Sequence, residues 1–557
     1  MPLSASDVSR LLAEIGRLTD LSGEPFKARA YHTAAENLLA HPVPLAETVA
    51  GGKLRTIPGV GEAIAEKIIR LHQTGSHPTL DYLREQYPPG LLEMFEIPGL
   101  GAKKIEIIHT VLKLITLEQL EAACKDGAVA ACKGLGKALE AKILKGLELR
   151  RAHAGAMLAD AADHRLRDAA GQLRASTPDL STVEPAGEVR RGCETVRSLV
   201  LAACGEPAKR TAPPAPPAPD VQLAVGAPEH FGATLLFATG SAAHVEALCA
   251  RAAGLKLSLT ERGLFRGKTA LDCRTENDIY SALKLAYIPP ELREGGGEIV
   301  AAEKHALPKL VEAADLRGIL HSHTTSSDGA RSLHDMAEAV RKRGYQYYGV
   351  ADHSQSAAYA GGMKEDKVRA QWKIADELNA GYVGKNFHIF KGVESDILAE
   401  GALDYPDAFI AGFDFVVASV HSRFSLDKEK QTARLLNAVA NPRTTILGHI
   451  TGRLLLKRDG YDIDIDAVLQ ACAKHGVAVE INAHPQRLDL DWRFHRRALE
   501  LGCMFSINPD AHDIPEIDLV RYGVNIARKG WVPADRVLNT KPLEEITEFF
   551  AKRRARR

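Results

Sequence analysis

GILHSH at residues 318–323 is the first of seven short apolar runs that each end on side chains able to bind a metal ion. The runs that follow it are YGVADH (348–353), IFKGVE (389–394), FVVASVH (415–421), TILGH (445–449), VAVEIN (477–482) and FSINPDAH (505–512). Each run has the length and the apolar content of a buried parallel strand. The intervening segments, such as SLHDMAEAVRKRG at 332–344, have the apolar spacing of helices. The series therefore predicts a repeating strand and helix unit.

The strand ends of such a repeat come together in space. In a barrel of strand and helix units, the C-terminal ends of the strands lie on one face. His321 and His323 alternate on the first strand end, so their side chains point to the same side and can bind one ion. We therefore expect a multinuclear metal site formed by the strand-end residues His321, His323, His353, Glu394, His421, His449, Asp510 and His512.

The composition is that of a large globular chain. With 557 residues, of which 45% are hydrophobic, the chain exceeds the usual size of one domain. No run of about twenty apolar residues is present, and the first residues, MPLSASDVSRLLAEIGRL, have the pattern of an amphipathic helix rather than of a signal sequence. We therefore expect a cytoplasmic protein that does not bind membranes.

The cysteines bear on zinc-thiolate sites and disulfides, and the charge balance bears on how nucleic acid could be bound. The eight cysteines form no Cys-x-x-Cys pair, which argues against zinc-thiolate sites and against a disulfide scaffold. Because the formal net charge is zero, nucleic acid would have to be bound by local basic patches and backbone amides. The final AKRRARR (551–557) is one such patch, although we favour a solvated, disordered tail.

Two segments near the N-terminus repeat one another. LRTIPGVGEAIAEKI at 54–68 and FEIPGLGAKKIEII at 95–108 each place a glycine-containing turn before a helix, and CKGLGKALEAKIL at 132–144 is a weaker third copy. Glycine permits the tight turn, and the free amides of the following helix can bind a phosphate. This is the pattern of the helix-hairpin-helix motif, which holds the DNA backbone without reading bases, although an ordinary helix corner would look similar. The predicted DNA contacts are Gly59, Gly61, Lys67, Gly99, Gly101, Lys103 and Lys104.

The region beyond residue 150 shifts towards short strands. PAKRTAPPAPPAPD at 207–220 is expected to be an extended surface excursion, because so many prolines exclude both a helix and a central strand. VQLAV at 221–225 and the residues after it return to strand and helix patterns. The polar, glycine-bearing YIPPELREGGGEIV at 287–300 is predicted to be a linker into the barrel.

In this order, the motifs resemble those of a family X DNA polymerase that carries a C-terminal PHP domain, named after polymerases and histidinol phosphatase. The resemblance spans nearly the whole chain. It is carried by FKARAYHTAA (26–35), the two full hairpins, GEVRRGCETV (187–196), FATGSAAH (237–244), YIPPELRE (287–294) and the barrel series, which includes HSHTTSSDG, GVESDI, GHITGR and EINAHPQRLDL.

The resemblance implies a multidomain chain of the α+β and α/β classes. The implied domains are an all-helical DNA-end-binding, lyase-like domain (1–80), a fingers-like helix-hairpin-helix region (81–150), a nucleotidyltransferase-like palm and thumb (151–286), a linker (287–313) and a distorted (β/α)7 PHP barrel (314–557). Lys67 falls where related polymerases place the Schiff-base lysine of a deoxyribose-phosphate lyase, although a surface lysine is the favoured interpretation. Arg190, Arg191 and the turn Thr239, Gly240 and Ser241 are implied phosphate contacts.

The palm departs from the family pattern at the residues that nucleotidyl transfer needs. Three carboxylates hold two magnesium ions in intact relatives. Here Ser198 and Val200 stand at two of these positions and Gln222 at the third. Because neutral groups cannot replace this charge, we expect no Mg²⁺ in the palm and no polymerase activity. Asp220, two positions before Gln222, and a misplaced alignment are the alternatives.

The barrel keeps a complete set of ligands. The PHP arrangement implies one ion held by His321, His323, Glu394 and Asp510, a second held by His421 and His449 with Glu394 as the bridge, and a third held by Asp328, His353 and His512. Arg453 and Arg487 are candidate phosphate clamps, because a guanidinium matches two phosphate oxygens. Asn482 and His484 receive no assigned role. His334, His388, His475 and His495 are expected to be structural.

These features predict a DNA repair enzyme that hydrolyses phosphodiesters with up to three divalent ions, Mn²⁺ or Zn²⁺. The expected reaction is 3′-5′ exonuclease or end processing, including abasic sites, on gapped, nicked or 3′-ended DNA, catalysed by a monomer. Glu394, His323, Asp510, Arg453 and Arg487 are the residues expected to carry it. The alternatives are a gap-filling DNA polymerase with 3′-5′ exonuclease, a non-catalytic DNA scaffold, and a small-molecule phosphatase, which would not explain the hairpins.

Overall fold

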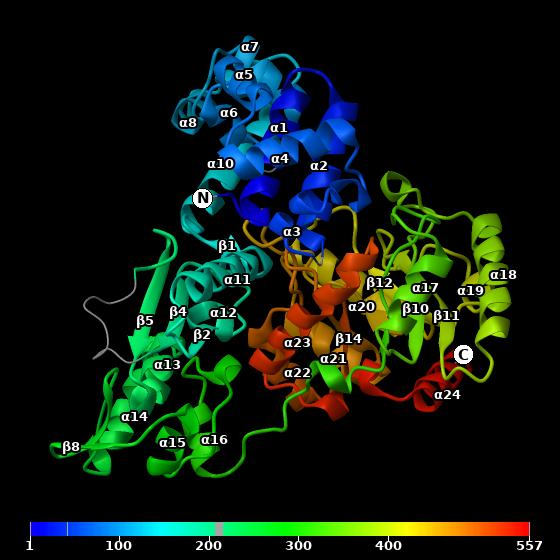
Figure 1. The fold of residues 1–557 in the computed structure, drawn as a ribbon. Helices are drawn as coiled ribbons and strands as arrows, with labels where there is room; N and C mark the ends of the chain where they lie inside the picture. Colours follow the sequence, from blue (N-terminus) through cyan, green and yellow to red (C-terminus); the bar gives the residue numbers. More distant parts are fainter. Residues whose placement is uncertain (1, 42, 98, 206–214, 556–557) are drawn as a thin grey trace. The chain divides into compact units, whose positions relative to one another are not determined.

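The structure is a computed structural model that describes residues 2–41, 43–97, 99–205 and 215–555 (Figure 1). The chain separates into two compact units, of which the first comprises residues 1–155 with 456–458 and the second residues 156–455 with 459–557. Most of the predicted proline-rich excursion at 207–220 lies outside the described residues. Across the described ranges, the structure contains no helix of sufficient length and hydrophobicity to span a bilayer.

The first unit is built from helices around one core. Its helices are α1 (Ala5–Leu21), α2 (Pro25–Ala40), α3 (Leu45–Ala50), the short 3-10 turn η1 (Leu54–Thr56), α4 (Glu62–Thr74), α5 (Pro78–Gln86), α6 (Pro89–Met94), α7 (Ala102–Thr110), α8 (Leu117–Lys125), α9 (Ala128–Ala131) and α10 (Lys137–Ala152). A single hydrophobic cluster extends from Val8 of α1 to Leu147 of α10. The domain boundary predicted at residue 80 therefore falls inside a shared core.

The segment predicted to be the palm lies in the second unit. It contains β1 (Met157–Leu158), α11 (Ala159–Ser176), β2 (Thr182–Pro185), α12 (Gly187–Arg190), β3 (Thr195–Val196), β4 (Leu199–Cys204) and β5 (Val221–Gly226). Strand β4 pairs antiparallel with β2 and parallel with β5, and this register sets Val200 opposite Gln222. Two of the three positions at which the resemblance places polymerase carboxylates are thus neighbours across the sheet.

The thumb follows the palm. Its elements are η3 (Pro228–His230), α13 (Phe231–Thr239), α14 (Ala242–Gly254), the antiparallel strands β6 (Ser258–Thr260), β7 (Gly263–Arg266) and β8 (Thr269–Leu271), α15 (Glu276–Ala282), η4 (Pro290–Leu292) and α16 (Glu298–Glu303). The prediction of a linker at 287–313 is wrong. Ile288, Leu292, Ala302 and Leu310 are buried in the thumb core, and this burial of apolar side chains fixes the segment in place.

The predicted barrel is confirmed as a seven-stranded sheet in which every neighbouring pair is parallel. In sheet order its strands are β9 (Gly318–Ile319), β10 (Tyr347–Val350), β11 (His388–Asp396), β12 (Phe415–Ser419), β13 (Ile446–Leu447), β14 (Ala478–Asn482) and β15 (Phe505–Asn508). The two edge strands approach each other: Ser322 and Ala511 form a parallel bridge, and the Asn539 amide bonds to both Gly318 and Ile507. The barrel is therefore nearly closed.

Helices surround this sheet. They are α17 (Leu333–Lys342), α18 (Glu365–Tyr382), α19 (Asp407–Ile410), α20 (Lys428–Ala440), α21 (Ile465–His475), α22 (His495–Leu501), α23 (Val520–Lys529) and α24 (Leu543–Arg554), with short 3-10 turns η5 (Ala313–Asp315), η6 (Ala358–Ala360), η7 (Trp492–Phe494), η8 (Ile514–Leu519), η9 (Ala534–Arg536) and η10 (Leu538–Thr540). The prediction of a disordered C-terminal tail is wrong up to Arg554, because the buried guanidinium of Arg553 donates to the carbonyls of His475 and Gly476.

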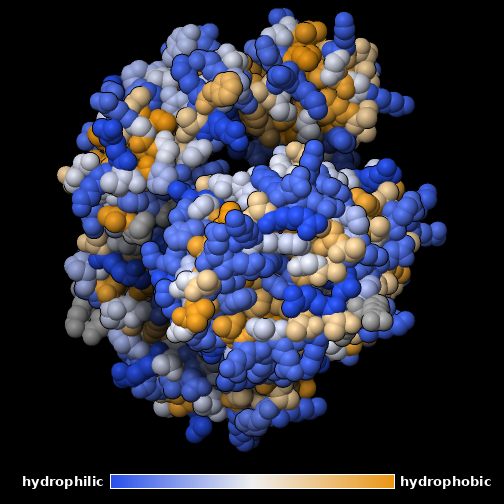
Figure 2. All heavy atoms as spheres, turned by 90° about the vertical axis from the view of Figure 1, so that its right-hand side faces the viewer, coloured by the Kyte–Doolittle hydropathy of each residue, from blue (hydrophilic) through white to orange (hydrophobic). Residues whose placement is uncertain are grey.

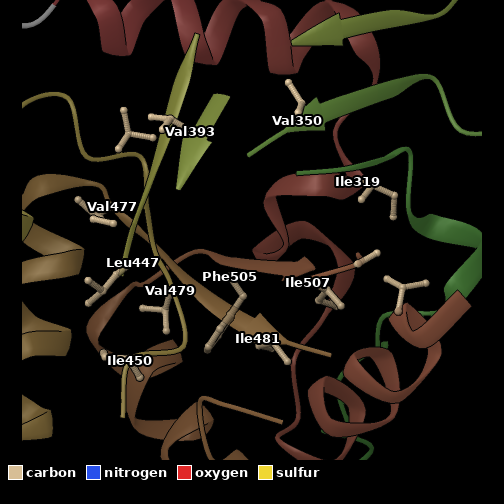
Figure 3. Close-up of a cluster of buried hydrophobic side chains, with 14 of the residues drawn as sticks. Ile319, Val350, Val393, Leu447, Ile450, Val477, Val479, Ile481, Phe505 and Ile507 are labelled. Carbon is tan, nitrogen blue, oxygen red and sulfur yellow. The ribbon is translucent and has the colours of Figure 1, made fainter. Parts of the chain in front are cut away.

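Alternating side chains of the strands form two separate cores. Ile319, Leu447 and Val479 belong to the large core shared with the helices, part of which is drawn in Figure 3. Their strand neighbours Leu320, Ile446 and Ala478 belong to a second cluster, which includes Phe550 of α24. This period of two is the alternation of a strand buried on both faces. On the outer face shown in Figure 2, hydrophilic side chains predominate and hydrophobic ones lie in small groups.

Candidate metal centre and nucleic-acid interface

Glu394 lies at the centre of the strand-end residues. It is 1% exposed and lies on strand β11, where histidines from the ends of four other strands surround it. The carboxylate atom Oε1 lies 3.0 Å from Nε2 of His449, 3.3 Å from Nε2 of His421 and 3.4 Å from Nε2 of His321. Its other atom, Oε2, lies 2.9 Å from Nδ1 of His353. One carboxylate thus faces imidazoles on both of its oxygens, as a bridging ligand would.

Two further carboxylates flank this centre. Asp510 places Oδ1 3.0 Å from Nε2 of His323 and 3.4 Å from Nε2 of His321. Asp328, in the loop after β9, faces the same region, with oxygens 3.6 Å from Nε2 of His512 and 3.7 Å from Nε2 of His353. The structure therefore brings together every residue of the predicted metal set.

These residues satisfy the chemical requirements of a multinuclear site. Their donor atoms form three groups within 4.8 Å: His323, Asp328, His353 and His512; His321, His323 and Asp510; and His353, Glu394 and His421. Several buried donor atoms have no hydrogen-bond partner, among them Nε2 of His321, Nδ1 of His323 and Oε2 of Glu394. Buried polar atoms are normally paired, so unpaired imidazole and carboxylate atoms that converge on one point fit divalent transition metals.

The grouping differs in detail from the implied assignment. His323 stands within reach of two groups, and His353 lies near Glu394 as well as Asp328. The assignment of individual ligands to three ions therefore stays a prediction, although the set as a whole is assembled.

The electrostatics of the cluster are those of anions surrounded by imidazoles. Although burial opposes ionisation, His421, His353 and His321 hold the pKa of Glu394 well below its usual range. The pKa of Asp510 is likewise held well below its usual range, by His321 and His323. Burial lowers the pKa of His323 to about 3, with a further contribution from the His512 and His353 imidazoles. A neutral His323 presents a lone pair, which is the form that binds a metal.

Two carboxylates behind the ligands orient their rings. Nδ1 of His321 lies 2.6 Å from Oε1 of Glu480, and Nδ1 of His421 lies 2.6 Å from Oδ1 of Asp396. A proton held on Nδ1 leaves Nε2 free to point at Glu394, which fixes the metal-binding tautomer. The sequence prediction missed both residues. Their position, alternating with buried apolar residues on β14 and β11, was the available signal.

The two predicted phosphate clamps are placed differently. Arg453 directs Nε to the carbonyl of Arg487, one terminal nitrogen to Asp491 and the other to the carbonyl of Leu488. Three of the five N–H groups of its guanidinium are thus engaged within the fold, and the role of Arg453 as a phosphate clamp stays a prediction. Nε of Arg487 lies 3.7 Å from Oδ2 of Asp510, and the side chain is 21% exposed, so this arginine does face the cluster.

Asn482 and His484 lie beside the same carboxylate. The Asn482 amide donates to Oδ2 of Asp510 over 3.0 Å, and its carbonyl accepts from the backbone amide of His484. Of the histidines expected to be structural, His495 is fully buried and contacts the carbonyl of Leu490, whereas His334 is exposed on α17. Neither of these two belongs to the metal groups of the described residues.

Tyr359 is a feature that the sequence prediction missed. Its side chain is 71% exposed, yet its ring lies edge-on to His353 and His421, with centroids 6.0 and 6.1 Å away. An exposed aromatic ring next to a buried ligand cluster can stack on a nucleobase. The AYA sequence of its 3-10 turn carries little signal for such a role.

The helix-hairpin-helix turns in the first unit share one backbone geometry. Gly59, Gly99 and Gly134 have φ of 77°, 87° and 96°, a region in which only glycine is unstrained. In each turn the following apolar residue donates its amide to the carbonyl three residues back. Gly61 and Gly101 then precede α4 and α7, and a Cβ atom on either would meet nothing within 4 Å. The amides that follow them are therefore accessible to a phosphate.

The lysines near these turns lie on the surface. Nζ of Lys104 donates to the carbonyl of Gly99 over 2.8 Å, and Nζ of Lys67 lies 3.5 Å from the carbonyl of Ala63. Lys103 is exposed at the start of α7. Their roles in DNA binding, and that of Lys67 in lyase chemistry, stay predictions.

The altered palm positions contain no cluster of carboxylates. Ser198 is exposed before β4, and its backbone amide donates to the Glu188 carboxylate over 3.0 Å. Asp220, the alternative third carboxylate, forms a two-point ion pair with Arg165 over 3.0 and 3.1 Å. Within the described ranges, every group of three or more possible ligands lies in the barrel.

The palm arginines that the resemblance assigned to phosphate are engaged inside the protein. Arg190 bonds through both terminal nitrogens to Glu276, and Arg191 bonds to Glu294 over 2.8 Å. The carbonyl of Thr239 also accepts from Arg191, and the Thr239 hydroxyl contacts Arg190. Contacts of these arginines with DNA stay a prediction that would require these ion pairs to open.

Comparison with known proteins matches three segments of the chain to family models and most of its length to one relative. Residues 5–77 match the model of a helix-hairpin-helix domain, residues 234–294 that of the DNA polymerase beta thumb and residues 320–484 that of the PHP domain. The DNA polymerase/3′-5′ exonuclease PolX of Bacillus subtilis is 34% identical, over 98% of this chain and 99% of that protein. A probable phosphatase of Thermoanaerobacter sp. strain X514 is 27% identical over 42% of this chain and 94% of its own length.

Proposed function

Because the chain belongs to the family X DNA polymerases that carry a C-terminal PHP domain, we propose that it is a DNA-processing enzyme whose working chemistry is metal-dependent phosphodiester hydrolysis in the barrel. The observation that carries this proposal is the convergence of unpaired imidazole and carboxylate atoms around Glu394. The relative named as a 3′-5′ exonuclease supports hydrolysis from a 3′ end as its direction.

The residues of the cluster would each have a definite task. Divalent ions held by the predicted ligand set would acidify a water molecule and neutralise charge on the phosphate oxygens. Glu480 and Asp396 keep the Nδ1 protons on His321 and His421, so that both rings present Nε2 to the centre. Arg487, whose Nε lies 3.7 Å from Oδ2 of Asp510, would bind an oxygen of the scissile phosphate.

The DNA would be held at two places. Tyr359 is placed to stack on the base of the terminal nucleotide, because its exposed ring lies beside the ligands His353 and His421. The hairpin turns of the first unit would bind backbone phosphates through free amides, without regard to sequence. Such a division suits an enzyme that trims ends of any sequence.

We further propose that the palm does not catalyse nucleotidyl transfer. Neutral side chains occupy all three carboxylate positions, and the nearby Glu188, Asp220 and Glu276 are engaged with backbone amides or arginines. Two-metal catalysis requires several open anionic oxygens at one point.

The test of the proposal is degradation of a 5′-labelled duplex with a recessed 3′ end by the full-length chain in Mn²⁺. We expect shortening from the 3′ end that is lost in His323→Ala and Asp510→Ala. His334→Ala is the matched control, because this histidine is exposed and outside the cluster. A wild-type chain that binds metal but leaves the duplex intact would contradict the proposal and favour a DNA scaffold. Preference for a phosphate monoester would instead favour a small-molecule phosphatase.

Gap-filling polymerisation is the second candidate, because the similar Bacillus subtilis protein is named as a polymerase as well as an exonuclease. Primer extension in the Asp510→Ala background, in which degradation cannot hide the product, separates the two. We expect no extension. Extension that survives substitution of Glu188 and Asp220 would mean that the palm carboxylates lie elsewhere in the sequence.

The metal, the role of Lys67 and the oligomeric state can each be tested separately. Mixed imidazole and carboxylate ligands favour Mn²⁺ or Zn²⁺ over Mg²⁺, and metal analysis of the purified chain would distinguish the two. A lyase role for Lys67 would be revealed by borohydride trapping of the chain on abasic DNA. A monomer acting in the cytoplasm completes the proposal, and light scattering would test its oligomeric state.

A further inference from the structure

A palm residue reaches the barrel through a segment that leads to the metal cluster. Within the second unit, the Glu194 carboxylate accepts hydrogen bonds from the Trp492 indole over 3.0 Å and from the Arg493 guanidinium over 2.7 Å. Both partners belong to η7 of the barrel, and the side chain of Glu194 is only 11% exposed. Glu194 is thus a buried anion whose partners come from the other domain.

The contact continues from η7 towards the active site. Arg493 also bonds to both oxygens of Asp491, over 2.9 and 3.0 Å, and Asp491 bonds to Arg453 over 2.7 Å. Arg453 in turn donates to the carbonyls of Arg487 and Leu488. An unbroken chain of charge-assisted hydrogen bonds therefore runs from Glu194 to the backbone that carries Arg487.

The segment 484–493, here called the strap, connects the end of β14 to η7. Leu488 and Leu490 of the strap are at most 1% exposed, so the burial of these two apolar side chains holds the strap against the barrel. Its middle is held by Arg453 and by Thr451, whose amide and hydroxyl donate to Asp489. At its C-terminal end, Trp492 and Arg493 donate to Glu194. Arg487, at the middle of the strap, stands 3.7 Å from the metal-ligand candidate Asp510.

We propose that Glu194 is a positioning residue for the barrel, which acts through the strap to hold Arg487 at the metal cluster. This inference rests on the proposed function of that cluster. The polymerase-type motif Arg190-Arg191-x-x-Glu194 would then serve hydrolysis in the barrel instead of nucleotide transfer in the palm.

Three other contacts of the palm and thumb with the barrel end on a different helix. Glu291 pairs with Arg528 over 2.6 Å, Glu294 pairs with Lys529, and Asp163 contacts Tyr522 over 3.1 Å. All three barrel partners lie on α23, outside the strap. Glu291→Gln therefore removes a carboxylate from the same interface without touching the chain of contacts to Arg487, and it is the matched control for Glu194→Gln.

Amide exchange of the full-length chain is the primary test. Loss of charge-assisted hydrogen bonds should speed exchange in a peptide covering 484–493 about tenfold in Glu194→Gln, with no such change in Glu291→Gln. Equal exchange in the two variants would overturn the proposal. This result does not depend on the nuclease assay, so failure of the strap and failure of the proposed function can be told apart.

Kinetics on the recessed 3′ end provide the second test. We expect Glu194→Gln to lower kcat/KM about fivefold in the wild-type background. In the Arg487→Ala background it should have no further effect, because the two residues would act through the same series of hydrogen bonds. A merely structural Glu194 would lower the Tm and give additive losses in kcat/KM, which would refute a positioning role.

Discussion

The palm and the mouth of the barrel are both rich in charged residues, but they use them in opposite ways. In the palm and thumb, Glu276 is bonded by Arg190 and Arg293, and Asp220 is bonded by Arg165. At the barrel mouth, Glu394 and Asp510 face imidazoles 2.9 to 3.4 Å away, and donor atoms such as Nε2 of His321 have no partner. A closed set of ion pairs holds a fold together, whereas an open set can bind an ion.

This difference supports the proposal that hydrolysis takes place in the barrel. Burying a carboxylate is costly unless its partners satisfy it. In the described part of the palm and thumb, Asp220 and Glu276 are satisfied by the guanidiniums of Arg165, Arg190 and Arg293. The barrel leaves its carboxylates to be completed from outside, which is the condition of a binding site.

The largest expected effect comes from Glu394, at the centre of the metal-ligand cluster in the barrel. Glu394→Gln keeps the shape of the side chain but removes the charge that four histidines surround, and we expect hydrolysis of the recessed 3′ end to fall roughly a thousandfold or more. Manganese titration should show fewer bound ions in the variant. Glu338→Gln on α17, a carboxylate paired with Arg341 on the outer surface, is the control. Activity within tenfold of wild type would mean that the cluster is not the catalytic centre.

The second largest effect concerns the buried ion pairs of Glu276, which are tested by the pH dependence of stability. Although burial opposes it, bonding to Arg190 and Arg293 lowers the pKa of Glu276 from 4.5 to about 2. A lowered folded-state pKa contributes stability that is fully present above pH 4.5 and is lost as the pH falls towards 2, and here it amounts to roughly 3 kcal/mol. Glu276→Gln should therefore be less stable than wild type at pH 7, and the difference should shrink between pH 5 and pH 2.

Urea unfolding at several pH values measures this difference. Glu303→Gln is the control, because that carboxylate is 54% exposed beside Arg251 and its loss should change the free energy of unfolding little at any pH. A Glu276 effect that is independent of pH would show that the buried ion pairs do not act through charge.

The third effect concerns the residues behind the ligands. Glu480→Gln removes the acceptor that holds the Nδ1 proton of His321, while an amide of similar size remains. We expect the affinity for Mn²⁺ to fall between tenfold and a hundredfold, as is usual when a partner of a metal-bound histidine is lost. Asp396→Asn should act in the same way on His421. Calorimetric titration that finds unchanged affinity in both variants would remove the role assigned to them.

Much of the barrel could be predicted from the sequence for a simple reason. A buried parallel strand is a short apolar run, and a ligand at its end stands out because it interrupts that run. Glu394 and Asp510 were found in this way. Asp396 lies on the same strand as Glu394 and Glu480 lies on β14, yet their role depends on distances to imidazoles more than twenty residues away, which the local pattern does not contain.

Where the prediction failed, partners distant in sequence decided the outcome. Arg453 is a candidate phosphate clamp by residue type, but Asp491 and two strap carbonyls accept three of its five N–H groups, which the sequence pattern did not indicate. The segment 287–313 looked like a linker because of its glycines, but Ile288 and Leu292 are buried in the thumb core. In each case the residue type was compatible with two environments, and tertiary contacts selected one.

The smallest effect is expected at the rim of the open set, where contact with the substrate is made by a surface residue. Tyr359→Ala should raise KM for the recessed 3′ end about tenfold with little change in kcat, because stacking on one base contributes roughly 1 to 3 kcal/mol to binding. Tyr359→Phe should retain wild-type KM, since the ring and not the hydroxyl would stack. Tyr82→Ala in the first unit, another exposed tyrosine at 61%, is the control for the loss of a surface ring. If Tyr359→Ala lowered kcat and left KM unchanged, the ring would act on the ligands His353 and His421 and not on the DNA.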